Sequence, residues 1–150
     1  MHNAIRLLKK DHQNVKTLFR KFEKAGSRAF KTKQELAEQI CDELEAHTEL
    51  EEKYFYPFAK EQLNRGEDKL VVEALQEHNV VKRLIKEIRR RYPEHEEFEA
   101  KMAVLIENVR HHIREEEETL FPALMKKLAH KEDLDLLGEE MHERKAEMHA

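Results

Sequence analysis

The sequence predicts an all-α protein in which four long helices run antiparallel to their neighbours and are followed by a short C-terminal accessory helix or tail. Three observations indicate this class. Charged residues make up 40% of the 150 residues, while glycine and proline occur only three times each, as is typical of long helices. Apolar residues recur at alternating spacings of three and four, the period of a helix with one buried face. A two-helix unit also occurs twice.

The two copies of this unit align through their histidines. Aligning DHQNVKTLFRKF with EHNVVKRLIKEI places His12 over His78, and aligning HTELEEKYFYP with HIREEEETLFP places His47 over His112. The repeat therefore predicts one domain followed by an appendage. Their expected ranges are 1–130 for the domain, with repeats 1–65 and 66–130, and 131–150 for the accessory helix or tail.

Local signals mark the ends of the four helices. Gly26 ends the first, and Thr32 with Glu35 forms a T-x-x-E capping box that begins the second. Gly66 ends the second helix, and Pro93 suits the first turn of the fourth.

Two further features concern the later parts of the helices. Pro57 and Pro122 fall inside helical patterns, so we expect a kink or an early helix end at each. The last stretch is expected to form a short helix or a frayed tail. Its apolar positions are Leu134, Leu137, Met141 and Met148.

Each of the four predicted helices carries a buried stripe that contains a histidine. Two of the stripes also contain a glutamate four residues after the histidine. In chain order the stripes are Ile5, Leu8, His12, Val15, Phe19 and Phe22; Leu36, Ile40, His47, Glu51, Tyr54 and Phe58; Val71, Ala74, His78, Val81, Ile85 and Ile88; and Leu105, Val109, His112, Glu116, Leu120 and Leu124.

Four histidines and two glutamates in one core require a cationic partner. Burying each of them unpaired would cost on the order of a few kcal/mol, and the sum could exceed a net stability of roughly 5–15 kcal/mol. The spacing H-x-x-x-E places both side chains one turn apart on one face. Imidazole and carboxylate ligands without paired cysteines favour iron, manganese or zinc, and six ligands are too many for one tetrahedral zinc. The sequence therefore predicts two metals bridged by two carboxylates, with the candidate ligands His12, His47, Glu51, His78, His112 and Glu116.

The other titratable residues are expected on the surface. They are His2, His95, His111, His130, His142, His149, Glu115, Glu117 and Glu118. Pairing His111 with Glu115 would keep the four-residue spacing but would break the alignment of the two prolines. Tyr54 lies two turns after His47 on one face, so we expect core packing with its hydroxyl near the site. Direct ligation by Tyr54, or a hydrogen bond to a ligand, is the alternative.

Composition excludes several classes of protein. Cys41 is the single cysteine and is expected to be a small packed residue, so no internal disulfide can form. No secretory segment and no apolar run of membrane-spanning length is present, which favours a cytoplasmic location without a membrane partner. The net charge of −4 argues against nucleic-acid binding, and the arginines of KEIRRRY are explained by the dipole of the helix that ends there.

At its histidines the sequence resembles the hemerythrin-like, HHE cation-binding family. The family pattern of H and then H-x-x-x-E, given twice, is met by His12, HTELE, His78 and HIREE, and the resemblance covers about residues 1–130. It implies an up-down-up-down four-helix bundle around two non-haem iron ions, with the four histidines as ligands and Glu51 and Glu116 as bridging carboxylates. Oxygen-carrying hemerythrins bring a fifth histidine, whereas the flanking positions here are Ala74 and Lys82.

The resemblance implies a di-iron protein that binds O2 or a related small molecule, such as NO or peroxide, for sensing, scavenging or carriage. A di-iron enzyme with peroxidase-like, catalase-like or NO-reducing activity is one alternative, and an iron- or oxygen-responsive regulatory module is another. The sequence contains no nucleophile–base pair and no phosphate-binding loop, so no further catalytic residues are predicted. We expect a monomer or a small homo-oligomer.

Overall fold

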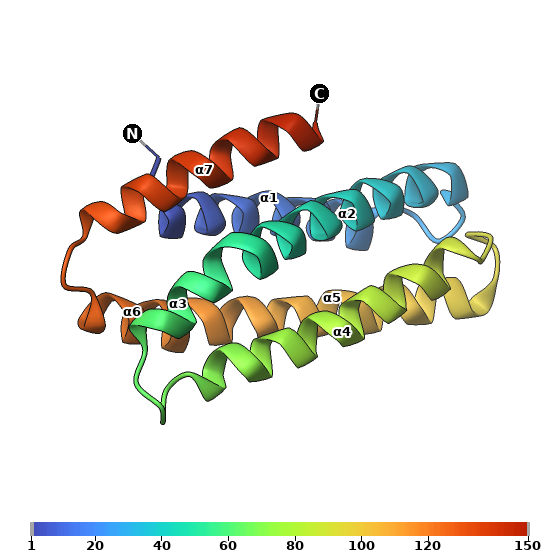
Figure 1. The fold of residues 1–150 in the computed structure, drawn as a ribbon. Helices are drawn as coiled ribbons and strands as arrows, with labels where there is room; N and C mark the ends of the chain where they lie inside the picture. Colours follow the sequence, from blue (N-terminus) through green and yellow to red (C-terminus); the bar gives the residue numbers. More distant parts are fainter. Residues whose placement is uncertain (1, 150) are drawn as a thin grey trace.

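The computed structural model describes residues 2–149, and the described chain is helical, as the sequence predicts. Four long helices form an up-down-up-down bundle, two short helices extend the second and fourth of them, and the last helix crosses the outside (Figure 1). The helices are α1 (Ala4–Lys24), α2 (Phe30–Leu50), α3 (Tyr56–Gln62), α4 (Lys69–Arg89), α5 (Glu96–Glu115), α6 (Phe121–Lys127) and α7 (Glu132–Met148). Within the described range, no helix is long and apolar enough to cross a membrane.

Buried apolar side chains form two clusters, one on each side of a polar layer. The first cluster includes Val15 and Phe19 and lies toward the α1–α2 connection. The second includes Leu8 and Leu124 and lies toward α6 and α7. His12 stands between Leu8 and Val15 along α1, at the level where the clusters separate. Each large apolar side chain that is fully buried in these clusters stabilises the fold by about 1.5–3 kcal/mol.

Two predicted helix starts are wrong by a few residues. Helix α2 begins at Phe30 without a side-chain cap, so Thr32 lies inside the helix and cannot serve as its N-cap. Helix α5 begins after Pro93, because the imidazole of His95 accepts a hydrogen bond from the backbone N–H of Glu97 at 3.1 Å. The helix is therefore capped by a histidine, an uncommon N-cap, and Pro93 lies before the helix and not in its first turn as predicted.

A π-helical turn interrupts each helix that carries a predicted H-x-x-x-E pair. The turns are η1 (Glu51–Phe55), between α2 and α3, and η2 (Glu116–Leu120), between α5 and α6. After each turn a backbone N–H donates to the carbonyl five residues earlier, and the next residue is Pro57 or Pro122. Proline has no N–H to donate, and its ring collides with the carbonyl four residues earlier, so the wider turn relieves both problems. The expected irregularity is present, although the helix continues instead of ending.

In the helix that contains η1, the extra residue of the π turn moves the later inward positions one residue along the chain from those predicted. The stripe predicted for the second helix contained Tyr54 and Phe58, which are only partly buried. Phe55, Tyr56 and Ala59 are buried instead, at 2% exposure or less. A uniform helical period cannot anticipate this shift, and it brings a different tyrosine inward.

Helix α7 packs across the start of α1. Leu134 and Met141 are buried under it, and Gly138 lies against the backbone of His2. A Cβ at Gly138 would come within 2.2 Å of the His2 carbonyl oxygen, so only glycine fits this close approach. The backbone N–H of His2 also donates to Glu139 at 3.1 Å. The C-terminal segment is therefore a packed helix and not a frayed tail.

Cys41 provides a direct test of packing in the first cluster. Its side chain is 0% exposed, and burial raises the pKa of the thiol to about 12. Because the thiolate is the reactive form, we expect no reaction of the folded protein with a chromogenic disulfide reagent at about pH 8, and rapid reaction in guanidinium. Absorbance of the released thiolate measures both. Fast labelling without denaturant would show that this part of the core opens readily.

Candidate metal centre

The four predicted histidines and two predicted glutamates meet in the polar layer between the apolar clusters. All six residues are at most 8% exposed. Their nitrogen and oxygen atoms form two groups, within each of which the atoms lie no more than 4.8 Å apart. Both glutamates belong to both groups, which are His12, His47, Glu51 and Glu116, and Glu51, His78, His112 and Glu116. The structure thus brings the six residues together, and their role as ligands stays a prediction.

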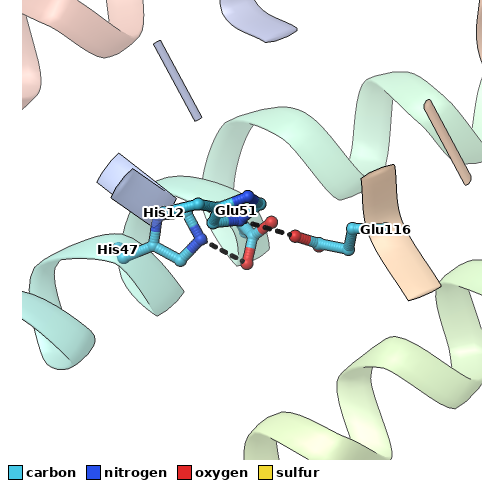
Figure 2. A group of neighbouring side chains, drawn as sticks. All are labelled: His12, His47, Glu51 and Glu116. Atoms are coloured by element: carbon cyan, nitrogen blue, oxygen red, sulfur yellow. Dashed lines mark hydrogen bonds and ion pairs between the residues drawn. The ribbon is translucent and has the colours of Figure 1, made fainter. Parts of the chain in front are cut away.

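The first group is built from α1, α2 and the two π turns. Figure 2 shows its two imidazoles and two carboxylates pointing toward one another. His12 Nε2 lies 3.1 Å from Glu116 Oε1, and His47 Nε2 lies 3.2 Å from Glu51 Oε1. Ligands at about 2.0–2.2 Å from a common metal would stand about 3 Å from their neighbours. The first group has this spacing.

The second group has similar spacing and joins α4 and α5 to the same carboxylates. His78 Nε2 lies 3.0 Å from Glu51 Oε1 and 3.2 Å from His112 Nε2. His112 Nε2 lies 3.3 Å from Glu116 Oε2. Because Glu51 and Glu116 approach histidines of both groups, they occupy bridging positions.

Two buried polar atoms in this cluster have no hydrogen-bond partner. They are His47 Nε2 and Glu51 Oε2. Buried polar atoms in proteins are nearly always satisfied, so each such atom requires an explanation. A metal ion accepts electron pairs from both kinds of atom, and imidazole with carboxylate is a donor set suited to iron, manganese or zinc. The residues present therefore fit a metal.

A carboxylate stands behind each imidazole, on its Nδ1 side. The pairs are His12 with Glu117 at 2.6 Å, His47 with Asp11 at 3.1 Å, His78 with Glu52 at 2.8 Å, and His112 with Glu77 at 2.7 Å. Such contacts fix the tautomer and direct Nε2 at the metal position. The assignment of Glu117 to the solvated surface was wrong, since its side chain is only 25% exposed and contacts His12. The repeat contained a signal that was missed. An acidic residue precedes the first histidine of each half, as Asp11 and Glu77, and another follows the glutamate of each H-x-x-x-E motif, as Glu52 and Glu117.

Replacing Glu117 with glutamine tests whether these four carboxylates, the outer carboxylate layer, support metal binding. We expect metal affinity to fall by about 10- to 100-fold, because the amide cannot hold the His12 imidazole as the carboxylate does. Glu118→Gln, which changes an exposed neighbour on the same turn, should leave the affinity unchanged. Competition with a coloured iron chelator measures both. Equal affinities in the two variants would argue against an outer carboxylate layer.

Tyr56, and not Tyr54, reaches the centre. The Tyr56 hydroxyl donates a hydrogen bond to Glu116 and lies 3.1 Å from His78 Nε2 and 3.3 Å from His112 Nε2. The equivalent position in the second repeat is Phe121, so a phenol stands beside the histidines of the second group but not those of the first. The π turn is the reason that the sequence pointed to the wrong tyrosine.

Without a metal, the charges of the buried histidines and glutamates shift one another's pKa values. Burial raises the pKa of Glu51, but the charge of His47 and hydrogen bonds from neighbouring side chains hold it well below its usual range. Burial lowers the pKa of His47, whereas the Glu51 carboxylate and Asp11 raise it more, to about 10. Burial lowers the pKa of His112, but the charge of Glu116 and the hydrogen bonds to neighbouring carboxylates together hold it well above its usual value. Protons therefore supply the positive charge in the metal-free cluster.

A small cavity adjoins all four histidines on the side of the first apolar cluster. It offers about 20 Å³ to the centre of a water-sized molecule, and a single water requires roughly 10–15 Å³. Most of its other walls are apolar, namely Val15, Leu44, Val81, Val109 and Ile113. The space suits one very small molecule.

The surface histidines lie outside both groups. His111 is 55% exposed, and its Nε2 comes no nearer than 3.8 Å to Glu115, so this pair does not build the site. His2 and His142 stack on each other at the α1–α7 contact, with ring centroids 3.6 Å apart.

Comparisons with known proteins agree with this architecture. The model of the hemerythrin HHE cation binding domain matches residues 3–124. A DNA nickase from Nostoc sp. (strain PCC 7120) is 31% identical over 123 residues, which are 82% of this chain and 34% of that protein. The chain thus spans about a third of the length of this relative.

A solved structure resembles almost the whole chain. The crystal structure of a hemerythrin HHE cation binding domain-containing protein from Mycobacterium kansasii matches with a TM-score of 0.83 at 26% identity. The match covers 99% of this chain and 88% of that one. With the family match over residues 3–124, and with clusters of histidine and glutamate able to bind metal, the chain belongs to the hemerythrin HHE cation-binding domain family.

Proposed function

We propose that this chain is a non-haem di-iron protein that binds O2 or a related small molecule, such as NO or peroxide, for sensing, scavenging or carriage. One observation carries the proposal: two histidine groups share both carboxylates and adjoin a cavity with room for a molecule about the size of water. An organic substrate would not fit this space. The donor set and the cavity together favour a redox metal pair that meets a very small ligand.

The chain's own residues have separate roles in this proposal. His12 and His47 would hold one iron, His78 and His112 the other, and Glu51 and Glu116 would bridge them. The irons, when bound, would supply one-electron redox chemistry that no side chain here can supply. The outer carboxylates orient the imidazoles, and the apolar cavity walls exclude bulk water.

Metal analysis and spectroscopy test the proposal. The protein should purify with, or take up, close to two irons per chain. After anaerobic reduction, its absorption spectrum should change when O2, NO or peroxide is added. Loading with zinc alone, together with no spectral response of an iron-loaded sample, would overturn the proposal.

Turnover of peroxide or NO is a second candidate function. Tyr56 favours it, because its buried phenol lies beside the histidines of the second group, and its one O–H can turn from Glu116 to a small ligand bound there. Burial, followed by the charges of Glu116 and Glu51, raises the pKa of Tyr56 well above its usual value, so the hydroxyl keeps its proton. Ala74 and Lys82 also leave the centre without a fifth histidine.

Oxidation and turnover assays decide between carriage and catalysis. We expect the reduced protein to oxidise within minutes in air instead of releasing O2 reversibly, and the oxidised protein to consume peroxide slowly. Tyr56→Phe should slow peroxide consumption by about a hundredfold, the lower end of the usual range for a proton donor. Tyr54→Phe is the matched control and should leave the rate unchanged. Reversible O2 uptake without peroxide consumption would identify a carrier.

A further inference from the structure

A groove separates α1 from α7 on the outside of the bundle. It offers about 460 Å³ and is lined on the α1 side by Asn3, Arg6, Lys10 and Asn14, and on the α7 side by His142, Lys145 and His149. The α1 residues recur every three or four positions, as do the α7 residues, so one ridge from each helix faces the groove. His2 and His142 stack where the helices meet.

The groove contains positive charge that the described residues do not neutralise. Within residues 2–149, neither Arg6 nor Lys10 forms an ion pair, although the whole chain has a net charge of −4. The one acidic side chain among its described lining residues is Asp11, which is 4% exposed. Asp11 directs one oxygen to Lys145 and the other to His47, so its carboxylate is already in use.

The groove therefore has more hydrogen-bond donors than acceptors. A guanidinium carries five N–H donors and an ammonium three. Lys145 uses its ammonium on Asp11 but retains capacity for a second acceptor, and the side chains of Arg6 and Lys10 have no acceptor among the described residues. Charge-assisted hydrogen bonds to oxyanions are the strongest contacts that such groups make.

We propose that the groove between α1 and α7 binds a phosphate-type oxyanion held by Arg6, Lys10 and Lys145. Arg6 and Lys10 from α1 and Lys145 from α7 line the same groove, so a single anion in it can contact donors from both helices. Asp11 stands between the groove and the histidine cavity and lines both. The anion site is therefore separate from the metal centre and adjacent to it.

Titration calorimetry with inorganic phosphate on the iron-loaded protein tests the site at constant ionic strength. We expect saturable binding that the double variant Arg6→Gln, Lys10→Gln weakens at least about tenfold, since it removes two charged donors. The matched control Lys9→Gln, Arg20→Gln removes two other exposed charges from α1 and should bind phosphate as the parent does. Because phosphate also binds iron directly, only a loss specific to the groove variant supports the proposal.

Further arms identify the source of the phosphate group. Tighter binding of adenosine monophosphate than of phosphate, lost in the groove variant, would indicate a nucleotide, and equal binding would indicate a free anion. Both results support the site. Equal phosphate binding by the groove and control variants would overturn it, as would binding of short duplex DNA without binding of phosphate. None of these results depends on whether the iron centre reacts with oxygen.

Discussion

Replacing Glu51 with glutamine should remove most of the iron from both positions of the centre, leaving well below one iron per chain. The reason is geometric: Glu51 Oε1 lies 3.2 Å from His47 Nε2 and 3.0 Å from His78 Nε2, so one carboxylate serves both groups. Glutamine has nearly the same shape but lacks the charge that draws two cations together. His47→Ala should have a smaller effect, because it removes a ligand from the first group only.

The matched control for these variants is His111→Ala. His111 precedes the candidate ligand His112 and starts the alternative pair with Glu115, but it is 55% exposed and lies outside both groups. Iron content measured by emission spectrometry should therefore stay at the parent level. If His111→Ala lost as much iron as His47→Ala, or if Glu51→Gln kept both irons, the ligand assignment would be wrong.

Removing the metal should lower the melting temperature by about 10 °C at neutral pH. A ligand present at a thousand times its dissociation constant stabilises the folded state by about 4 kcal/mol, and 1 kcal/mol corresponds to roughly 2–4 °C in a protein of this size. A bound ion would offset repulsion between the buried carboxylates of Glu51 and Glu116, which are at most 1% exposed. Calorimetry of loaded and chelated samples measures the difference.

The two samples should respond to pH in opposite directions. In the metal-free protein the pKa of His47 is raised to about 10 from a usual value near 6.5, so the folded state binds this proton more tightly than the unfolded state. That stabilisation is complete below about pH 6.5 and is lost as the pH rises toward 10. Metal requires unprotonated imidazoles, so the loaded protein loses its ion on acidification, below roughly pH 5.

The gap between the two melting temperatures should therefore widen from about pH 6 to about pH 9. Identical melting of loaded and chelated protein throughout this range would mean that no cation stabilises the buried carboxylates. A gap that narrowed with rising pH would contradict the assignment of His47 as a group that carries a proton in the metal-free state.

Local spacing was sufficient to predict the bundle and the convergence of the six clustered residues. Spacings of three and four identify the buried face of each helix. Each of the four faces has a histidine at a matching position of the repeat, so the four histidines must lie at about the same level along the bundle. The outer carboxylates were not predicted because a residue next to an inward one, such as Glu117, is expected to point away. In the structure, the long side chain of Glu117 bends back toward the core, and its carboxylate contacts His12.

Tyr56 was missed for a different physical reason. Sequence periodicity assumes one constant rotation per residue, and a π turn violates that assumption without a composition of its own. Pro57 indicated that the helix was irregular at this point but not how the irregularity would be resolved. The predicted starts of the second and fourth helices were also wrong, because any of several neighbouring residues can cap a helix and the sequence does not show which one does.

The paired π turns are consistent with an internal duplication of this chain. Each is a one-residue insertion relative to a regular helix, and the two stand at equivalent places in the repeats, directly before Pro57 and Pro122. One insertion in an ancestral half, inherited by both copies when that half was duplicated, explains them with a single event. Tyr56 and Phe121 stand in matching places of the two halves, so the halves differ by one hydroxyl at this position.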